Sequence, residues 1–348
     1  MSHSTKLSGR GFFRKLHFMS YFRYSLICAL LLLLVACQDE IPQVDDQPVY
    51  KTKNVVVIVI DGPRYSETWG AVKREHIPVR SGLLPQGLLV DQFFNNGVTF
   101  TNPGHCALCT GVYDPLANNG TELPHNPGMF QSFIRYKNQP PYKAYIVTSK
   151  DKLYVLGNTQ KPGYKNINRP YIDCGVNVNG TGGYRADSIT MEHILHILDT
   201  KKPRLLFINL KDPDTYGHAA DSLGYIRAIE KSDEYVGIIW DRLQSDPFYK
   251  DQTTLFVTND HGRHRDGHLD GFVSHGDKCS GCRRVELFAI SPDFKKNVVI
   301  QTPYEQIDVP CTIAELLHFP MPFAKGKVMW ELFDERVNVR KLPHERSH

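Results

Sequence analysis

The chain has 348 residues, a formal net charge of +4 at pH 7 and hydrophobic residues at 41% of its positions. A chain of this length and composition can bury a sizeable core, and it shows no internal repeat or low-complexity segment. No basic stripe with interleaved aromatic residues is present, so the sequence gives no support to nucleic acid recognition.

Residues 1–36 have the pattern of an export signal peptide. Basic residues precede an apolar run from Ser25 to Ala36, which falls short of the roughly 20 residues that a spanning helix needs. The run ends in Leu34-Val35-Ala36-Cys37, which resembles a bacterial lipobox. The resemblance implies cleavage before Cys37 and lipidation of its thiol, and a multiply acylated cysteine anchors stably. The alternatives are a cleaved signal beside an ordinary cysteine, or a retained helix.

Residues 37–50 are polar and contain two prolines, which predicts a tether after the lipidated cysteine. We therefore expect a lipoprotein of the bacterial cell envelope, anchored by lipid to a membrane, with the outer membrane or cell surface favoured. Residues 51–335 are within reach of one large catalytic α/β domain, and residues 336–348 form a polar tail.

Short apolar runs alternate with helical patterns along the domain. This alternation predicts a three-layer α/β/α sandwich with a mostly parallel central sheet. Met191, Ile194, Leu195 and Leu198 form the clearest helical stripe, and residues 219–243 predict a longer helix. The expected strands are 55–60, 98–100, 145–148, 205–210, 255–258 and 285–290.

Polar residues with metal-binding chemistry follow several of these runs. Asp61 follows the first strand, Thr101 the second, Asp214 comes soon after residues 205–210, and Asp260-His261 follows residues 255–258. Ligands of open α/β sheets bind beyond the carboxyl ends of the strands. One such aspartate is ordinary turn chemistry, but the whole set indicates a binding site at one edge of the sheet.

The segment from Thr101 to Gly111 reads T-x-P-x-H-x-x-L-x-T-G. It resembles the nucleophile motif of the alkaline phosphatase superfamily, in the form used by nucleotide pyrophosphatase/phosphodiesterases and some monoesterases. The sulfatase branch has a cysteine or serine at the first position, which is oxidised to formylglycine. Threonine cannot undergo that conversion, so Thr101 argues against a sulfatase.

Further motifs follow in the order of that superfamily: Val-Ile-Asp61-Gly, D-x-x-G-H at 214–218, D-H-G at 260–262 and S-H-G at 274–276. The resemblance implies two metal ions, one held by Asp61, Thr101, Asp260 and His261, and the other by Asp214, His218 and His275. His105 is expected to position or pack, and His264 and His268 to be solvated loop residues.

These residue types suit hydrolysis of small phosphorylated substrates. Two cations about 4 Å apart can clamp the attacking and leaving oxygens of a phosphate ester, and a threonine hydroxyl needs activation before it attacks. Mixed Asp and His ligation favours Zn²⁺, with Mn²⁺ as the alternative. We expect Thr101 to form a phospho-threonine intermediate.

Phosphomonoester hydrolysis is the favoured activity. Phosphodiester or pyrophosphate hydrolysis is the alternative, and a mutase of the same superfamily is less expected because an exported enzyme would lack cytoplasmic sugar phosphates. An alternative of another class is a metal-binding surface lipoprotein without catalysis.

The segment Lys150-Asp151-Lys152 resembles the K-D-R element of a monoesterase subgroup, in which the basic residues contact the terminal phosphate oxygens. The resemblance implies that Lys150 and Lys152 bind substrate, although Lys152 replaces an arginine and loses its bidentate fork. The alternative is a solvated turn. The nucleotide pyrophosphatase branch has, at the position of Gly104, an asparagine that helps to hold the phosphoryl oxygens. The resemblance implies that Asn118, Asn119 or Asn126 in the following loop could take that role here.

Six cysteines follow Cys37 in the chain. Their even number in an exported protein permits disulfides, and buried free thiols are equally compatible. Two C-x2-C pairs, Cys106/Cys109 and Cys279/Cys282, instead allow a four-cysteine metal site if the fold brings them together.

Overall fold

The computed structural model describes Met1 and residues 48–335. The export signal, Cys37, most of the tether and the polar tail lie outside the described residues. No helix within the described part is long and apolar enough to cross a membrane.

The described residues form a nine-stranded sheet with the order β4-β3-β5-β1-β6-β7-β2-β8, and β9 pairs with β2. The five adjacent strands β4, β3, β5, β1 and β6 all run parallel to one another, whereas β7 is antiparallel to both β6 and β2. The strands are β1 (Asn54–Ile60), β2 (Leu88–Phe94), β3 (Ala144–Thr148), β4 (Tyr171–Cys174), β5 (Leu205–Leu210), β6 (Thr253–Thr258), β7 (Arg284–Ile290), β8 (Val298–Ile300) and β9 (Tyr304–Glu305).

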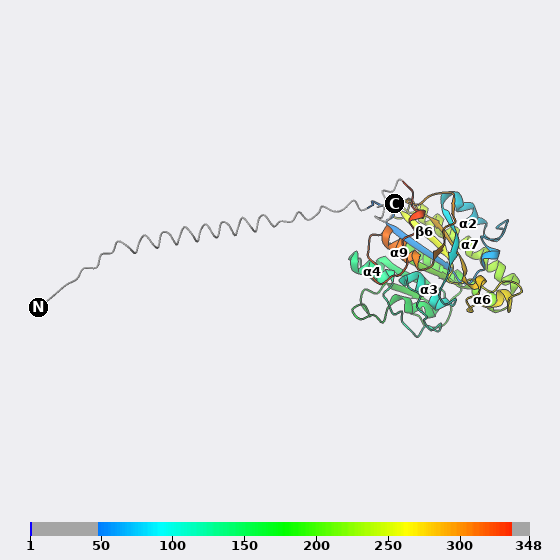
Figure 1. Cartoon of the computed structure of the whole chain (residues 1–348), viewed down its shortest axis with the longest axis horizontal. Coiled ribbons are helices and arrows are strands. Elements are labelled where there is room, and N and C mark those ends of the chain that lie inside the picture. The colour runs from blue at the N-terminus through cyan, green and yellow to red at the C-terminus, as the bar shows by residue number, and fades with distance from the viewer. Residues whose placement is uncertain (2–47, 336–348) are drawn as a thin grey trace, which may run out of the picture. The chain divides into compact units, whose positions relative to one another are not determined.

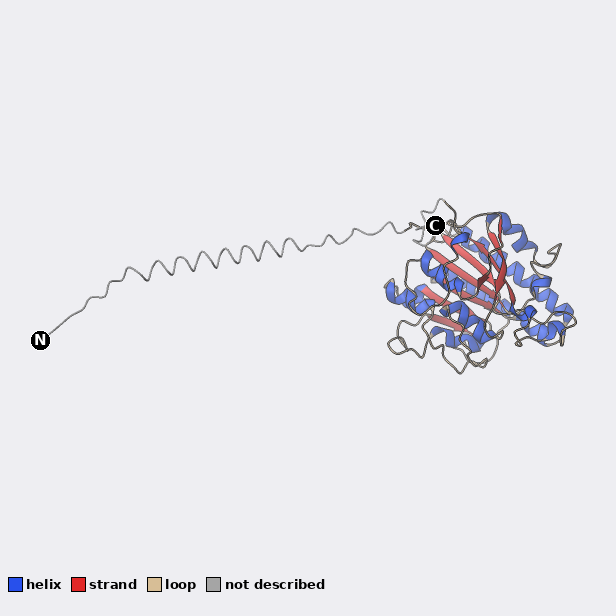
Figure 2. Cartoon of the chain, viewed as in Figure 1, coloured by secondary structure: helices blue, strands red, loops and turns tan. Residues whose placement is uncertain are grey.

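Helices cover both faces of this sheet, as Figures 1 and 2 show. They are α2 (Pro78–Leu83), α3 (Thr101–Thr110), α4 (Met129–Tyr136), α5 (Asp187–Thr200), α6 (Asp212–His218), α7 (Ser222–Ser245), α8 (Ser280–Arg283) and α9 (Asp308–Leu316). The predicted three-layer α/β/α architecture is confirmed.

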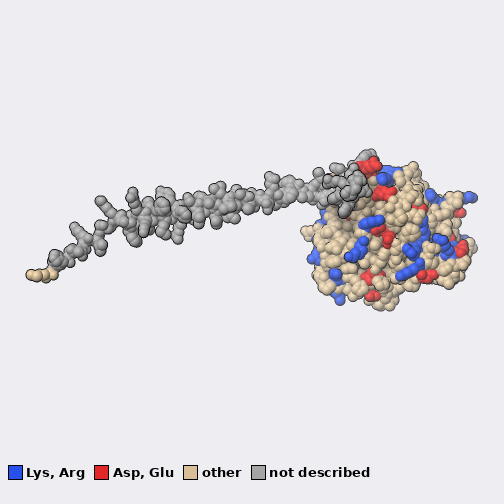
Figure 3. Space-filling view, in the orientation of Figure 1, with Lys and Arg blue, Asp and Glu red and all other residues tan. Residues whose placement is uncertain are grey.

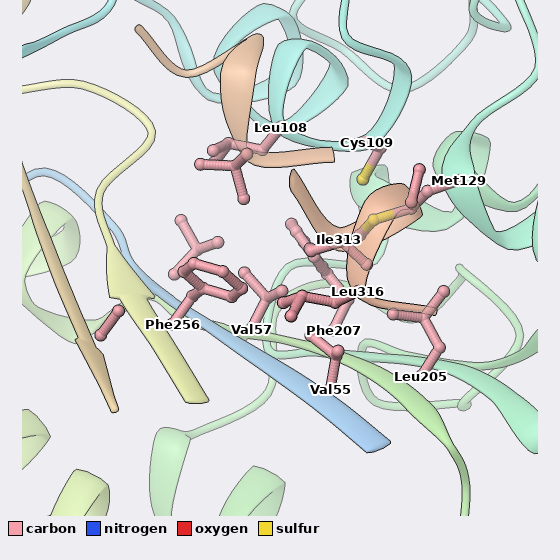
Figure 4. Close-up of a cluster of buried hydrophobic side chains, with 14 of the residues drawn as sticks. Val55, Val57, Leu108, Cys109, Met129, Leu205, Phe207, Phe256, Ile313 and Leu316 are labelled. Carbon is pink, nitrogen blue, oxygen red and sulfur yellow. The ribbon is translucent and has the colours of Figure 1, made fainter. Parts of the chain in front are cut away.

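The core divides into two layers because successive side chains of a strand point to opposite faces. Val55, Val57 and Val59 of β1 pack in one cluster with side chains of α3, α4 and α9 (Figure 4). Val56, Ile58 and Ile60 pack in the other cluster with side chains of α5 and α7. Every residue of β1 is therefore buried, as expected for a central parallel strand.

Two sequence predictions of secondary structure need correction. Residues 98–100 form no strand but lead as a loop into α3, whose first residue is Thr101. Pro103 is compatible with this helix because proline is tolerated in its first turn, whereas it could not donate to the ladder of a strand continued past residue 100. The long helix begins at Ser222 rather than at Ala219, since the side chain of Asp221 accepts a hydrogen bond from Gly224 N and caps it.

On the face seen in Figure 3, basic and acidic side chains are interspersed. The described surface in this view therefore carries both signs of charge side by side.

Candidate active site

Four adjacent strands bring the predicted site residues to one edge of the sheet. Strands β3, β5, β1 and β6 are neighbours in that order and run parallel. Lys150 follows β3, Asp61 follows β1, and Asp260 follows β6, while Asp214 lies on the short helix α6 just after β5. Residues that are distant in sequence therefore meet beyond the carboxyl ends of these four strands.

Asp61, Asp260 and His261 form what we call the buried cluster. All three side chains are fully buried. His261 Nε2 lies 3.5 Å from Asp61 Oδ1 and 3.3 Å from Asp260 Oδ2. These three atoms are buried and make no hydrogen bond. An unpaired buried polar atom is costly, so three of them converging on one point fit the chemistry of a bound cation.

Asp214, His218 and His275 form a second group, the open cluster. His218 Nε2 and His275 Nε2 are 3.0 Å apart, and they lie 3.3 and 3.4 Å from Asp214 Oδ1. The side chain of His218 is 48% exposed, so this cluster faces solvent on one side. The predicted ligands of the second metal thus converge on one point that a substrate can reach.

The rings of His261 and His275 stack with their centroids 3.6 Å apart, which joins the two clusters. Potential ligand atoms of Asp214, His261 and His275 lie within 4.8 Å of one another, and so do those of Asp61, His105 and Asp260. This grouping places His105 where the sequence predicts His261. Both ring nitrogens of His105 already have partners, Thr101 O at 2.9 Å and Asn209 Nδ2 at 3.0 Å, so His261 with its unpaired Nε2 is the better ligand.

Thr101 is the first residue of α3 and is 2% exposed. Its Oγ1 accepts a hydrogen bond from Lys150 Nζ at 3.1 Å. Gly104, one turn further along α3, lies against the backbone of Asp260, and a Cβ at this position would overlap the Asp260 carbonyl oxygen. The glycine therefore allows the helix that carries Thr101 to approach the buried cluster closely.

Lys150 joins the three parts of the site. Its Nζ lies 2.8 Å from Asp61 Oδ2 and 2.6 Å from Asp214 Oδ2, besides its bond to Thr101. The side chain is 2% exposed. The alternative of a solvated turn is therefore wrong for Lys150.

The ammonium of Lys152 contacts Asn118 instead of a carboxylate of the two clusters. Its Nζ donates to Asn118 O at 3.1 Å and to Asn118 Oδ1 at 3.0 Å. The backbone N–H of Asn102, in the first turn of α3, donates to the same Oδ1. Among the three candidate asparagines, Asn118 is the one that these contacts bring beside the start of α3, whereas Asn119 accepts bonds from Thr121 in an exposed turn.

The pKa values in the site are shifted because several carboxyl groups are buried close together beside few cationic side chains. Burial raises the pKa of Asp61 to about 7, and the neighbouring charge of Asp260 adds to this rise. Burial holds the pKa of His261 well below its usual value, which favours the neutral imidazole that metals bind. Burial opposes the charge of Lys150, but the carboxylates of Asp214 and Asp61 outweigh it and raise its pKa.

Two further residues belong to the site, although neither was predicted from the sequence. Asn209 on β5 donates through Nδ2 to Asp61 Oδ2 and to His105 Nε2. The fully buried Arg263 donates to the backbone oxygen of Asp214 at 2.9 Å and pairs with its carboxylate. A Cβ at Gly217 would meet this guanidinium at 2.5 Å, which gives a physical reason for glycine in D-x-x-G-H.

The structure also corrects the expectations for the remaining histidines and the cysteines. His264 is 3% exposed and is not a solvated residue, whereas His268 is exposed. Cys106 and Cys109 lie buried in α3, apart from Cys279 and Cys282, which group with His264 and Asp277. The four-cysteine metal site is therefore wrong, and the six cysteines between residues 48 and 335 are free thiols.

Comparison with known proteins agrees with this geometry. The Metalloenzyme superfamily profile matches residues 100–276. A phosphopentomutase from Clostridium botulinum is 31% identical over 133 residues, or 38% of this chain and 30% of that protein. Ectonucleotide pyrophosphatase/phosphodiesterase family member 1 from Mus musculus is 25% identical over 228 residues, or 61% of this chain and 24% of that protein. The chain thus spans less than a third of the length of either relative.

The fold has relatives among solved structures. A protein in the alkaline phosphatase superfamily from Vibrio parahaemolyticus aligns with a TM-score of 0.56 and 13% identity, over 83% of this chain and 72% of that one. With the profile match over half of the sequence, these similarities establish that the chain belongs to the metalloenzyme superfamily, with an alkaline phosphatase-like fold.

Proposed function

We propose that the protein is a metal-dependent phosphomonoester hydrolase in which Thr101 is the nucleophile. The observation that carries this proposal is the position of Lys150, whose ammonium contacts the Thr101 hydroxyl and one carboxylate from each cluster. A cationic donor beside a buried hydroxyl stabilises the alkoxide that must attack.

The residues fit two divalent ions, preferably Zn²⁺ with Mn²⁺ as the alternative. The buried cluster with Thr101 would hold one ion and the open cluster the other. Bound there, the ions supply charge neutralisation for the phosphate and activation of oxygen nucleophiles. The neutral state of His261 and the unpaired atoms of Asp61 and Asp260 support such binding.

The protein's own groups support a two-step displacement. Thr101 Oγ1 loses its proton to solvent and forms a bond to phosphorus while the bond from phosphorus to the ester oxygen breaks, which gives a phospho-threonine and an alcohol that takes up a proton. Water then loses a proton and forms a bond to the same phosphorus, the bond from phosphorus to Thr101 Oγ1 breaks, and Oγ1 is protonated again. Lys150 donates to the oxygen that attacks first and leaves last. The N-terminal end of α3, on which Thr101 lies, favours the negative charge that develops there.

The charges near Thr101 favour a monoester. A monoester carries more negative charge than a diester, and Lys150 beside Thr101 and Lys152 beside Asn118 add two cationic side chains near the start of α3 that favour it. The similarity to a pyrophosphatase/phosphodiesterase keeps diester or pyrophosphate hydrolysis as the second candidate. The similarity to a phosphopentomutase adds phosphoryl transfer between pentose hydroxyls as a third.

The test compares hydrolysis of p-nitrophenyl phosphate and bis-p-nitrophenyl phosphate by the purified full chain with added Zn²⁺. Thr101→Ala and EDTA should each abolish turnover, whereas Thr110→Ala, which removes a buried threonine from the same helix, should retain it. Acid-quenched enzyme should carry phosphate on Thr101. Diester preference would select the second candidate, and interconversion of pentose phosphates the third. Bound zinc without turnover would favour the metal-binding lipoprotein.

We propose in addition that the protein is exported and lipid-anchored through Cys37. The basic start, the apolar run and the lipobox-like residues support this proposal. Cells fed a radiolabelled fatty acid should label the protein, and Cys37→Ser should remove the label and leave the signal uncleaved. Equal labelling of the Cys37→Ser protein would exclude the anchor.

A further inference from the structure

A second group of metal-binding side chains lies outside the buried and open clusters. His264, Asp277, Cys279 and Cys282 each present one nitrogen, oxygen or sulfur atom, and these four atoms lie within 4.8 Å of one another. His264 comes from the loop after β6, Asp277 and Cys279 come from the segment that leads into α8, and Cys282 lies in α8. We call these four residues the cysteine cluster. None of them is a predicted ligand of the catalytic metals.

His264 points an unpaired nitrogen into this cluster. Its side chain is 4% exposed, and its Nδ1 lies 2.7 Å from Asp270 Oδ1. With Nδ1–H donating to that carboxylate, Nε2 carries its lone pair. Nε2 is buried, makes no hydrogen bond and lies 3.3 Å from Asp277 Oδ1. Two lone pairs at this distance repel each other unless a proton or a metal cation lies between them.

The contacts around His264 and Asp277 match those of metal ligands in proteins. A metal-binding histidine usually donates its other nitrogen to a carboxylate, as His264 does to Asp270. Ligating carboxylates are themselves hydrogen-bonded, and His268 Nε2 lies 2.9 Å from Asp277 Oδ2. The exposed His268 thus has a role in fixing the carboxylate that faces the cluster.

The two cysteines complete a set of four donors. They are separated by two residues, and the backbone N–H of Cys282 donates to Cys279 Sγ at 3.4 Å. Cys282 is fully buried, and both thiols are free. Two sulfurs, one imidazole and one carboxylate form a four-ligand set of the kind that tetrahedral Zn²⁺ takes, and thiolates select zinc over magnesium or calcium.

We propose that the cysteine cluster binds a structural Zn²⁺ ion, separate from the catalytic metals. The four ligands join the two segments that carry His261 and His275, since His264 lies three residues after His261 and Asp277 two residues after His275. The same segments are already linked by the bonds His264 N to Ser274 O and Gly262 N to Cys282 O. The ion therefore fixes the loop that positions these imidazoles.

Cobalt substitution tests this proposal without any measurement of activity. The purified full chain is reduced, stripped of metal by a chelator and reloaded with Co²⁺. A thiolate-to-cobalt charge-transfer band is expected in the near ultraviolet, which ligands without sulfur cannot give. Cys279→Ser should lose the band and bind one metal equivalent fewer. Cys311→Ser, a matched change of a partly buried thiol, should keep both the band and the metal equivalent. Asp214→Asn, which alters a proposed ligand of the catalytic metals, should keep the band.

A second measurement needs no variant. A mercurial reagent that captures thiolates should release one zinc equivalent per chain from the wild-type protein, followed with a chromogenic chelator. Wild-type protein that gives neither the cobalt band nor mercurial-released zinc would overturn the proposal. A thiol count short by the Cys279 and Cys282 pair in the unreduced, denatured protein would also overturn it, because it would identify a disulfide instead. A band that persists in Asp214→Asn while turnover is lost separates this ion from the catalytic ones.

Discussion

Replacing Lys150 by methionine should destabilise the metal-free protein far more than the metal-loaded protein. The side chain is 2% exposed, and its ammonium lies 2.8 Å from Asp61 and 2.6 Å from Asp214. Methionine keeps the apolar stem but removes the charge. Removing one partner of a buried ion pair costs about 3–5 kcal/mol, because the other charge stays buried without compensation.

This cost converts into a measurable change in melting temperature. One kcal/mol corresponds to about 2–4 °C for domains of roughly this size, so the metal-free variant should melt about 6–20 °C lower. Divalent ions that bind Asp61 and Asp214 would neutralise the same carboxylates. The difference between variant and wild type should therefore shrink when zinc is added, and the variant should bind zinc at least about tenfold more tightly, a change of about 1.4 kcal/mol.

Thermal unfolding of both proteins in EDTA and in excess Zn²⁺ gives these values, and calorimetric titration gives the zinc affinity. Lys165→Met serves as the control, because Lys165 is exposed and should change nothing. An equal loss of stability with and without zinc would refute the reasoning, since it would mean that the ions and Lys150 do not share the carboxylates. Hydrolysis by the variant should fall by about 10²–10³-fold, as for the loss of one donor at a developing oxyanion.

Three more predictions follow from contacts in and around the site. Burial lowers the pKa of Lys152 to about 8, so its ammonium is charged below that pH and neutral above it. KM for a monoester should therefore rise about tenfold between about pH 7 and 9, the value of one charge-assisted bond, and a pH series should show that Lys152→Arg abolishes this rise. Superimposable pH profiles of the two proteins would contradict a role of Lys152 in binding the substrate. Gly104→Ala should force α3 away from the Asp260 carbonyl and lower kcat by about 10²-fold, and full activity would show that the helix has room to adjust. Arg80→Met should cost about 3–5 kcal/mol in urea unfolding, because it leaves Glu286 buried without its cation; an unchanged midpoint would argue that the ion pair contributes little.

The buried central strands were predictable from sequence because their patterns are unambiguous. Residues 55–60 and 205–210 are continuous apolar runs, and both form strands buried on two faces. Strand β2 (Leu88–Phe94) was missed because Asp91 and Gln92 interrupt its apolar pattern. The pairing of β2 with β7 shifts register between Val90 and Phe93, which breaks the alternation that sequence reasoning relies on.

The residues of the candidate site likewise divide into those that the sequence predicted and those that it did not. Asp61 comes directly after β1 and Asp260 comes two residues after β6, so a strand prediction alone placed them at one edge of the sheet. Asn209 carried a signal that went unused, since it is a polar residue inside a buried apolar strand and such a residue needs a partner. Arg263 carried none, because its contact with Asp214 depends on how the loop after β6 folds back onto α6.

His275 shows why that loop matters more to the site than its irregular structure suggests. No strand or helix carries this residue, in contrast to Asp61 at the end of β1 or Asp214 on α6. Its ring is held by the 2.7 Å contact of Nδ1 with Thr99 O and by stacking on His261. Both contacts orient the ring but do not fix the backbone, which turns at Gly276 with a φ of 114°. Asp277 of the cysteine cluster is the very next residue, so a metal bound to that cluster would supply the rigidity that the sheet supplies elsewhere. Loss of that metal should therefore weaken the open cluster first and leave the buried cluster, which rests mainly on β1 and β6, largely intact.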